Sequence, residues 1–185
     1  MRRILIACEF SGVVSRAFQA AGHEVMSCDL LPSEDSSLPH YEGDVRDILD
    51  AGYDLLCAFP PCRYLCSSGA RWHSTRRQEQ AEALEFVRTL LDADIPHIAL
   101  ENPVGVISTQ IRKPSQYIQP WEYGHGETKK TGLWLKNLPL LLPTNVVSGR
   151  ADRIHKMPPS PNRWRERSRT YQGIADAMAA QWGRC

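Results

Sequence analysis

The sequence contains no continuous apolar run of about 18 residues, the length that a membrane-spanning helix requires. Its first segment, MRRILIACEF, carries two arginines but reaches Glu9 before an apolar stretch of signal-peptide length can form. There is also no internal repeat in the 185 residues. We therefore expect a cytoplasmic protein without a membrane partner, folded as one domain over residues 1–185.

The six cysteines lack the CxxC spacing of a zinc ribbon and the density of a secreted disulfide scaffold, so we expect reduced thiols. Cys62, Cys66 and His73 could supply three zinc ligands, but their spacing matches no common pattern, and we predict no metal. A thiol or zinc redox protein that uses Cys62 and Cys66 remains an alternative interpretation of the same residues.

An excess of positive charge is also lacking, because the net charge of the whole chain is only +1. Positive charge is concentrated between residues 150 and 170, in a proline-containing segment that we expect to be a loop. Its basic residues are Arg150, Arg153, Lys156, Arg163, Arg165, Arg167 and Arg169. Such a segment can bind phosphates or can be a solvated surface, and the composition leaves both interpretations open.

Short apolar runs alternate with amphipathic segments through the first half of the chain, which is typical of a parallel sheet with crossover helices. The predicted strands cover residues 2–8, 23–30, 53–59 and 97–102, and the predicted helices cover 13–22, 76–94 and 171–182. We expect further strands within 132–147 and a proline-rich loop at 157–164. The predicted fold class is therefore α/β.

Side chains capable of chemistry or ligand binding follow several of these strands. In open parallel sheets, ligands collect beyond the carboxyl ends of the strands, so we expect these residues to converge at one edge. The candidates are Glu9, Phe10, Asp29, Asp44, Cys62 and Glu101.

Cys62 follows two prolines at the end of the predicted strand 53–59. Because proline fixes φ, such a turn is stiff and suits a side chain that must be held toward a ligand. A cysteine nucleophile reacts as the thiolate, so nearby cations would have to lower the pKa of Cys62. The candidate cations are Arg63, Arg71 and Lys129.

The stretch DLLCAFPPCRYLCSSG (54–69) resembles the proline-cysteine loop of the C5-cytosine methyltransferases, and ALENPVG (99–105) is similar to the Glu-Asn motif of that family. Other similar motifs occur in the family's order: EFSG (9–12), CDL (28–30), EGDV (42–45) and, more weakly, YGHGETKKTGLWL (123–135) and YQGIADAMA (171–179). The resemblance implies a Rossmann-like, S-adenosylmethionine-dependent methyltransferase fold, with helices on both faces of a mostly parallel central sheet.

For catalysis, the resemblance implies a covalent mechanism on cytosine. Cys62 attacks C6 of the base, which makes C5 nucleophilic toward the methyl group of S-adenosylmethionine. Glu101 donates a hydrogen bond or a proton at N3, and Asn102 braces the backbone of the Cys62 loop.

For the cofactor, the resemblance implies a site for S-adenosylmethionine beyond the first strands. Phe10 packs on the methionine or adenine moiety, and the turn at Gly12 lets the backbone approach the ligand closely. Asp29 accepts from the ribose hydroxyls, and Asp44 accepts from the adenine amino group. The full implied cofactor set is Phe10, Ser11, Gly12, Asp29, Asp44, Val45 and Phe59.

Residues 136–170 are too few for the separate target-recognition domain of the DNA-methylating members of the family. The expected substrate is then DNA, recognised with relaxed specificity or with a specificity-providing protein partner, and a free deoxycytidine nucleotide such as dCMP is the alternative. The expected substrate contacts are Arg63, Arg163, Arg165, Arg167 and Arg169. A catalytically idle nucleic-acid-binding module is the alternative without enzymatic activity.

Overall fold

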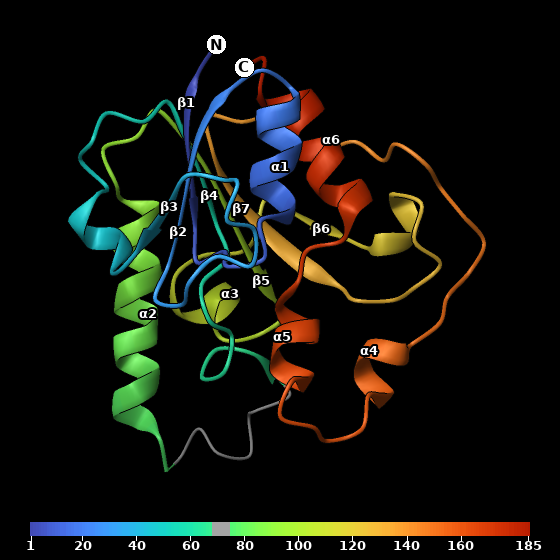
Figure 1. Cartoon of the computed structure of the whole chain (residues 1–185). Coiled ribbons are helices and arrows are strands. Elements are labelled where there is room, and N and C mark those ends of the chain that lie inside the picture. The colour runs from blue at the N-terminus through green and yellow to red at the C-terminus, as the bar shows by residue number, and fades with distance from the viewer. Residues whose placement is uncertain (68–74) are drawn as a thin grey trace.

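The computed structural model describes residues 1–67 and 75–185, and its centre is a seven-stranded sheet (Figure 1). The strands are β1 (Arg3–Ala7), β2 (Glu24–Asp29), β3 (His40–Glu42), β4 (Leu55–Ala58), β5 (His97–Pro103), β6 (Gln116–Ile118) and β7 (Thr131–Lys136). Their order across the sheet is β3-β2-β1-β4-β5-β7-β6. Neighbouring strands from β3 to β5 are parallel, whereas β7 runs antiparallel between β5 and β6.

Helices cover both faces of this sheet. The α-helices are α1 (Val13–Ala20), α2 (Arg77–Leu91), α3 (Ile107–Gln110), α4 (Arg153–Lys156), α5 (Arg163–Ser168) and α6 (Gln172–Trp182), and short 3-10 helices lie at η1 (Val45–Asp47) and η3 (Pro120–Glu122). Helices α1 and α6 lie side by side on one face, and α2 and α3 pack on the other (Figure 1). The α/β class, with a mostly parallel sheet and helices on both faces, is confirmed.

The two central strands β1 and β4 show why apolar runs predict strands in this chain. All four residues of β4 are buried, and Ile4, Leu5 and Ile6 of β1 have an exposed fraction of 0%. A parallel strand that is covered by helices on both sides needs apolar side chains on both faces, so its apolar residues do not alternate with polar ones. These strands deliver the turns that carry Phe10 and Cys62.

The turn between β1 and α1 depends on Gly12 and Glu9. Gly12 has a φ of 71°, and a Cβ atom there would lie 2.9 Å from Cδ1 of Leu38, so glycine is required. The buried carboxylate of Glu9 accepts from the backbone N–H of Val14 at 2.7 Å and of Ser15 at 3.1 Å. These N–H groups lie at the amino end of α1, where they have no hydrogen-bond acceptor within the helix. Glu9, which lies just beyond the carboxyl end of β1 as the sequence predicts, therefore stabilises the amino end of α1.

The structure differs from the sequence prediction mainly in its short elements. Within 132–147, where the sequence predicts strands, β7 is followed by irregular chain, and within 150–170, where it predicts a loop, α4 and α5 form. Strands β3 and β6 have three residues each, which is too short for an apolar period to show in the sequence. None of the helices in the described residues is long and apolar enough to cross a membrane.

Candidate active site

The candidate site residues lie at the carboxyl ends of neighbouring parallel strands. Asp29 is the last residue of β2, Phe10 follows β1, and Cys62 follows β4. Glu101 and Asn102 lie near the carboxyl end of β5. Because β1, β2, β4 and β5 are parallel, their carboxyl ends meet at one edge, which is the lower edge of the sheet in Figure 1. The predicted convergence on one edge is therefore present in the structure.

The Cys62 loop is fastened to the end of β5. Asn102, which has an exposed fraction of 1%, donates from Nδ2 to the carbonyl of Pro60 at 2.8 Å. Gly105 lies so close to the loop that a Cβ atom would be 1.9 Å from the Leu65 carbonyl oxygen. Two backbone hydrogen bonds complete the attachment. The N–H of Ser67 donates to the carbonyl of Val104 at 2.9 Å, and the N–H of Val106 donates to the carbonyl of Leu65 at 2.8 Å. The loop is thus held against the strand that carries Glu101.

The thiol of Cys62 is strongly influenced by its neighbours. The hydrogen bond with Cys66 raises the pKa of Cys62 most, followed by burial and by the charges of Cys66 and Glu101, while the ammonium of Lys129 lowers it. Of the three cations considered from sequence, Lys129 therefore acts in the expected direction. The guanidinium of Arg63 lies 5.4 Å from the Tyr64 ring centroid, and Arg71 lies outside the described residues. Cys62 in the free protein is held as a thiol.

Replacing Cys66 with alanine should make Cys62 more reactive toward alkylation. Loss of the hydrogen bond lowers the pKa of Cys62 and increases its thiolate fraction at mildly alkaline pH. We expect iodoacetamide to modify Cys62 several-fold faster in Cys66→Ala, as measured by peptide mass spectrometry. Cys185→Ala, which removes a half-buried thiol at the end of the chain, is the control and should leave the rate unchanged. An unchanged or slower rate in Cys66→Ala would contradict this account.

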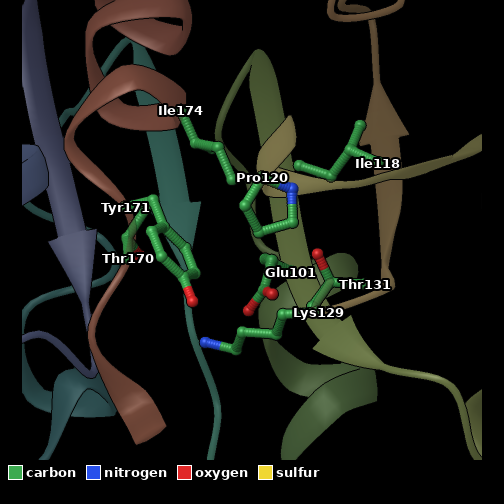
Figure 2. Close-up of a pocket in the computed structure, with 8 residues that line it drawn as sticks. All are labelled: Glu101, Ile118, Pro120, Lys129, Thr131, Thr170, Tyr171 and Ile174. Carbon is green, nitrogen blue, oxygen red and sulfur yellow. The ribbon is translucent and has the colours of Figure 1, made fainter. Parts of the chain in front are cut away.

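Glu101 lines a small pocket next to the Cys62 loop (Figure 2). The other residues that line it are Ile118, Pro120, Lys129, Thr131, Thr170, Tyr171 and Ile174. Burial raises the pKa of Glu101, while the charge of Lys129 and a hydrogen bond with Thr131 lower it. Figure 2 shows the carboxylate of Glu101 beside these two side chains. The raised pKa favours the protonated carboxyl, which is the form that can donate to a ligand.

Lys129 is the cation that Cys62 and Glu101 share, because its charge lowers the pKa of both. Its Nζ donates to the carbonyl of Arg169 at 3.2 Å and lies 6.0 Å from the ring centroid of Tyr171. These contacts place the ammonium between the Glu101 pocket and the chain that leads into α6.

The acidic residues on the cofactor side have different surroundings. Asp29 accepts from the N–H of Leu31 at 3.0 Å, and burial raises its pKa. Asp44 forms an ion pair with Arg46, accepts from its backbone N–H at 2.9 Å, and has its pKa lowered mainly by the hydrogen bond with the Arg46 side chain. Val45 is buried, and Phe59 is half-buried. A ligand that approaches Asp44 would share this carboxylate with Arg46.

The arginines of α5 lie partly against the body of the protein. The guanidinium of Arg165 is 5.7 Å from the ring centroid of Phe10, and Arg169 forms an ion pair with Glu34 at 2.5 Å. The Nε of Arg163 is buried and has no hydrogen-bond partner among the described residues. Arg167 is half-buried. The sequence predicts Arg165 and Arg169 as substrate contacts. The structure instead brings Arg165 to Phe10, one of the expected cofactor residues, and pairs Arg169 with Glu34.

No model of a known protein family matches the sequence, and no curated protein matches it. Among solved structures, a candidate DNA modification methyltransferase encoded within an E. coli prophage is similar, with a TM-score of 0.52 and 13% identity over 80% of this chain and 52% of that chain. The sheet order, with β7 antiparallel, agrees with this similarity. The fold is that of the class I S-adenosylmethionine-dependent methyltransferases.

Two further solved structures are similar at lower TM-scores. The S. pombe Dnmt2 methyltransferase has a TM-score of 0.47 and 14% identity, over 84% of this chain and 53% of that chain. A mutant of Spodoptera frugiperda DNMT2 has a TM-score of 0.48 and 15% identity, over 83% of this chain and 55% of that chain. The chain thus spans about half the length of the solved structures it matches. The predicted Rossmann-like methyltransferase fold is confirmed, and any reaction has to be argued from the site itself.

The cofactor-side residues fit S-adenosylmethionine. Gly12 gives the turn after β1 its left-handed conformation, and the aromatic residues Phe10 and Phe59 follow β1 and β4. The carboxylate of Asp29 offers acceptor oxygens of the kind that ribose hydroxyls require, at the end of the second strand. The ion pair of Asp44 with Arg46 is the one departure, because the sequence predicts that Asp44 faces the adenine amino group.

Sequence reasoning did not single out Trp164 or assign Cys66 a role at the thiol of Cys62. Trp164 lies with its ring centroid 5.7 Å from that of Phe10, and its only sequence signal is an aromatic residue within a run of arginines. The described residues contain no group of three or more His, Cys, Asp or Glu side chains that could hold a metal ion. His73, the third member of the zinc alternative, lies outside the described residues.

Proposed function

We propose that this chain methylates cytosine at C5, using S-adenosylmethionine, and that its substrate is DNA recognised with relaxed specificity or with a protein partner. The observation that supports this proposal best is that Cys62, in the loop after β4, is held by Asn102 and Gly105 against the end of the neighbouring strand β5, which carries Glu101. The charge of Glu101 raises the pKa of Cys62, and Lys129 lowers the pKa of both groups. The proposed nucleophile and proton donor therefore lie within the electrostatic influence of each other and of one cation.

Cys62 is the nucleophile of the proposed reaction. Its thiolate adds to C6 of cytosine, and the electron pair of the C5–C6 double bond moves into the ring toward N3. The bond from Asn102 to the Pro60 carbonyl and the contact at Gly105 hold the loop, so the sulfur does not have to be repositioned during the attack. After C5 is methylated, the electron pair of the C5–H bond forms the C5–C6 double bond as the proton leaves, and the C6–S bond breaks to release the Cys62 thiolate.

Glu101 and Lys129 manage the charge of this step. The raised pKa of Glu101 favours a protonated carboxyl that can donate to N3 as negative charge develops in the ring. A protonated Glu101 also removes the charge that opposes ionisation of Cys62, so base binding and thiolate formation support each other. The ammonium of Lys129 favours the thiolate in the same way.

The cofactor supplies, when bound, a methyl group on a positively charged sulfonium centre. The residues proposed to hold it are Phe10, Ser11, Gly12, Asp29, Asp44, Val45 and Phe59. Asp29 binds the ribose hydroxyls, and Gly12 holds the left-handed turn after β1. Phe10, Ser11 and Gly12 follow β1, Asp29 ends β2, Asp44 and Val45 lie at η1, and Phe59 follows β4, whose loop carries Cys62.

A free deoxycytidine nucleotide such as dCMP is the second candidate substrate. It is favoured by Arg163, whose Nε is buried without a hydrogen-bond partner among the described residues, because a single phosphate group would supply that partner. A free nucleotide also needs no base flipping, which a duplex substrate requires. In that case Arg63 and the arginines of α5 would bind the single phosphate of the nucleotide and not the phosphates of a DNA backbone.

The experiment that tests the function compares three substrates. Purified protein is incubated with S-adenosylmethionine labelled in the methyl group and with duplex DNA, single-stranded DNA or dCMP. We expect label in 5-methylcytosine from DNA, with little dependence on the surrounding sequence. Activity confined to dCMP would refute the DNA substrate and support the nucleotide. Absence of cofactor binding by calorimetry would refute both and leave the idle binding module.

A further inference from the structure

Phe10 is covered by a helix from the far end of the sequence. It directly follows β1 at the open edge of the sheet, yet its exposed fraction is only 6%. The ring of Trp164 lies 5.7 Å away, tilted by 56°, and the guanidinium of Arg165 lies 5.7 Å from Phe10 and 5.3 Å from Trp164. Helix α5 therefore shields the side chain that is expected to meet the cofactor.

The end of this helix is fastened on two sides. Arg169 pairs with Glu34 at 2.5 Å, and the N–H of Glu34 donates to the carbonyl of Phe10 at 2.8 Å. The ion pair thus ties α5 to a segment that is itself bonded to the cofactor turn. On the other side, Lys129 donates to the carbonyl of Arg169 at 3.2 Å. Helix α5 consequently lies between the turn at Phe10 and the Glu101 pocket.

Helix α5 is short and partly exposed. The helix has only six residues and none of them is buried, and the chain before it contains three prolines between residues 158 and 161. A helix of this length has little stability of its own, so its position depends on the contacts with Phe10 and Glu34. Both partners of the Arg169–Glu34 pair keep about a third of their side-chain surface exposed, at 33% and 30%. The pair can therefore open without unfolding the core.

We propose that α5 is a cover of the cofactor turn, closed by Trp164 and Arg165 over Phe10 and latched by the Arg169–Glu34 ion pair. Cofactor enters and leaves when the latch opens, and Trp164 forms the outer wall of the site when it is closed. This inference rests on the proposed use of S-adenosylmethionine. It gives Arg165 and Arg169 a role on the cofactor side, in place of the substrate contacts expected from sequence.

The first test uses the protein without cofactor. Hydrogen exchange of the amides in residues 163–169 is compared between the wild type, Glu34→Gln and Arg169→Gln. We expect faster exchange of α5 in both variants, by about three- to tenfold, since the latch is a partly shielded ion pair. Glu85→Gln, which breaks an exposed ion pair with Arg88 on α2, is the matched control and should leave α5 unchanged. Unchanged exchange in both latch variants would overturn the proposal.

The second test measures cofactor release. Bound, labelled S-adenosylmethionine is chased with an excess of unlabelled cofactor, and the dissociation rate should rise in Glu34→Gln and Trp164→Ala, whereas Trp164→Phe should retain the slow rate. Equal rates in all variants would overturn the cover even though the cofactor binds. If the wild type binds no cofactor while Glu34→Gln still loosens α5, the proposed function fails and only the contact of α5 with the turn survives.

Discussion

Replacing Cys62 with alanine should abolish methyl transfer to cytosine and leave the affinity for S-adenosylmethionine close to that of the wild type. Alanine has no group that can add to C6, and without this addition C5 does not become nucleophilic. All of the proposed cofactor residues except Phe59 lie after β1, at the end of β2 or at η1, away from the Cys62 loop, so their geometry does not depend on the thiol. Labelled methyl transfer and calorimetry with S-adenosylmethionine measure the two effects separately.

The matched control for this variant is Cys185→Ala, which should keep full activity. A covalent adduct gives an independent readout, because a substrate with fluorine at C5 has no proton to lose there and should stay bonded to Cys62. A protein–DNA complex that survives denaturation should therefore form with the wild type and not with Cys62→Ala. Methyl transfer at the wild-type rate by Cys62→Ala would remove the nucleophile from the mechanism.

The parts of the fold that the sequence predicts are those in which a local pattern has a global cause. Strand β4 and the part of β1 from Ile4 to Ala7 are apolar because helices cover both sides of them, and α2 shows its apolar face at helical spacing through Leu84, Val87 and Leu91. The carboxyl ends of parallel strands necessarily share an edge. The common position of Cys62 and Glu101 was therefore accessible from the sequence.

The features that the sequence does not predict depend on contacts between distant segments. Whether Glu9 meets a ligand or the amino end of α1 is decided by the path of the turn at Gly12. Whether the arginines of α5 face solvent or Phe10 is decided by packing between residues at opposite ends of the chain. The hydrogen bond between the thiols of Cys62 and Cys66 also depends on loop geometry. The spacing of the two cysteines alone cannot distinguish this hydrogen bond from a pair of metal ligands.

Such long-range contacts bear directly on the chemistry of the site. The sequence predicts that cations near Cys62 lower its pKa. In the structure, the thiol of Cys66 and the carboxylate of Glu101 raise the pKa of Cys62. These influences favour the thiol form of Cys62, and the thiolate is the form that reacts. In the proposed reaction, activation requires the substrate, whose N3 takes the hydrogen bond of Glu101 and so stabilises the neutral carboxyl. The proposed site would then react only when the base is present.

Replacing Glu101 with glutamine should lower the rate of methyl transfer by about two to four orders of magnitude, because the amide cannot deliver a proton at N3. The pH dependence should change as well. In the wild type the rate requires an ionised Cys62 and a protonated Glu101, so it rises with pH as the thiolate forms and levels off above the raised pKa of Glu101, where loss of the protonated carboxyl offsets the gain of thiolate. In Glu101→Gln the levelling should disappear and the rise should continue.

This change of profile distinguishes a proton donor from a residue that only supports the fold. The comparison is made by measuring single-turnover methyl transfer across pH for the wild type, Glu101→Gln and the exposed control Glu85→Gln. Helix α2 carries Glu85 on its surface, and the control should reproduce the wild-type profile. Loss of rate in Glu101→Gln with an unaltered profile would mean that the carboxyl shapes the pocket beside Lys129 and Thr131 without exchanging a proton, and that the charge in the ring is stabilised by Lys129 alone.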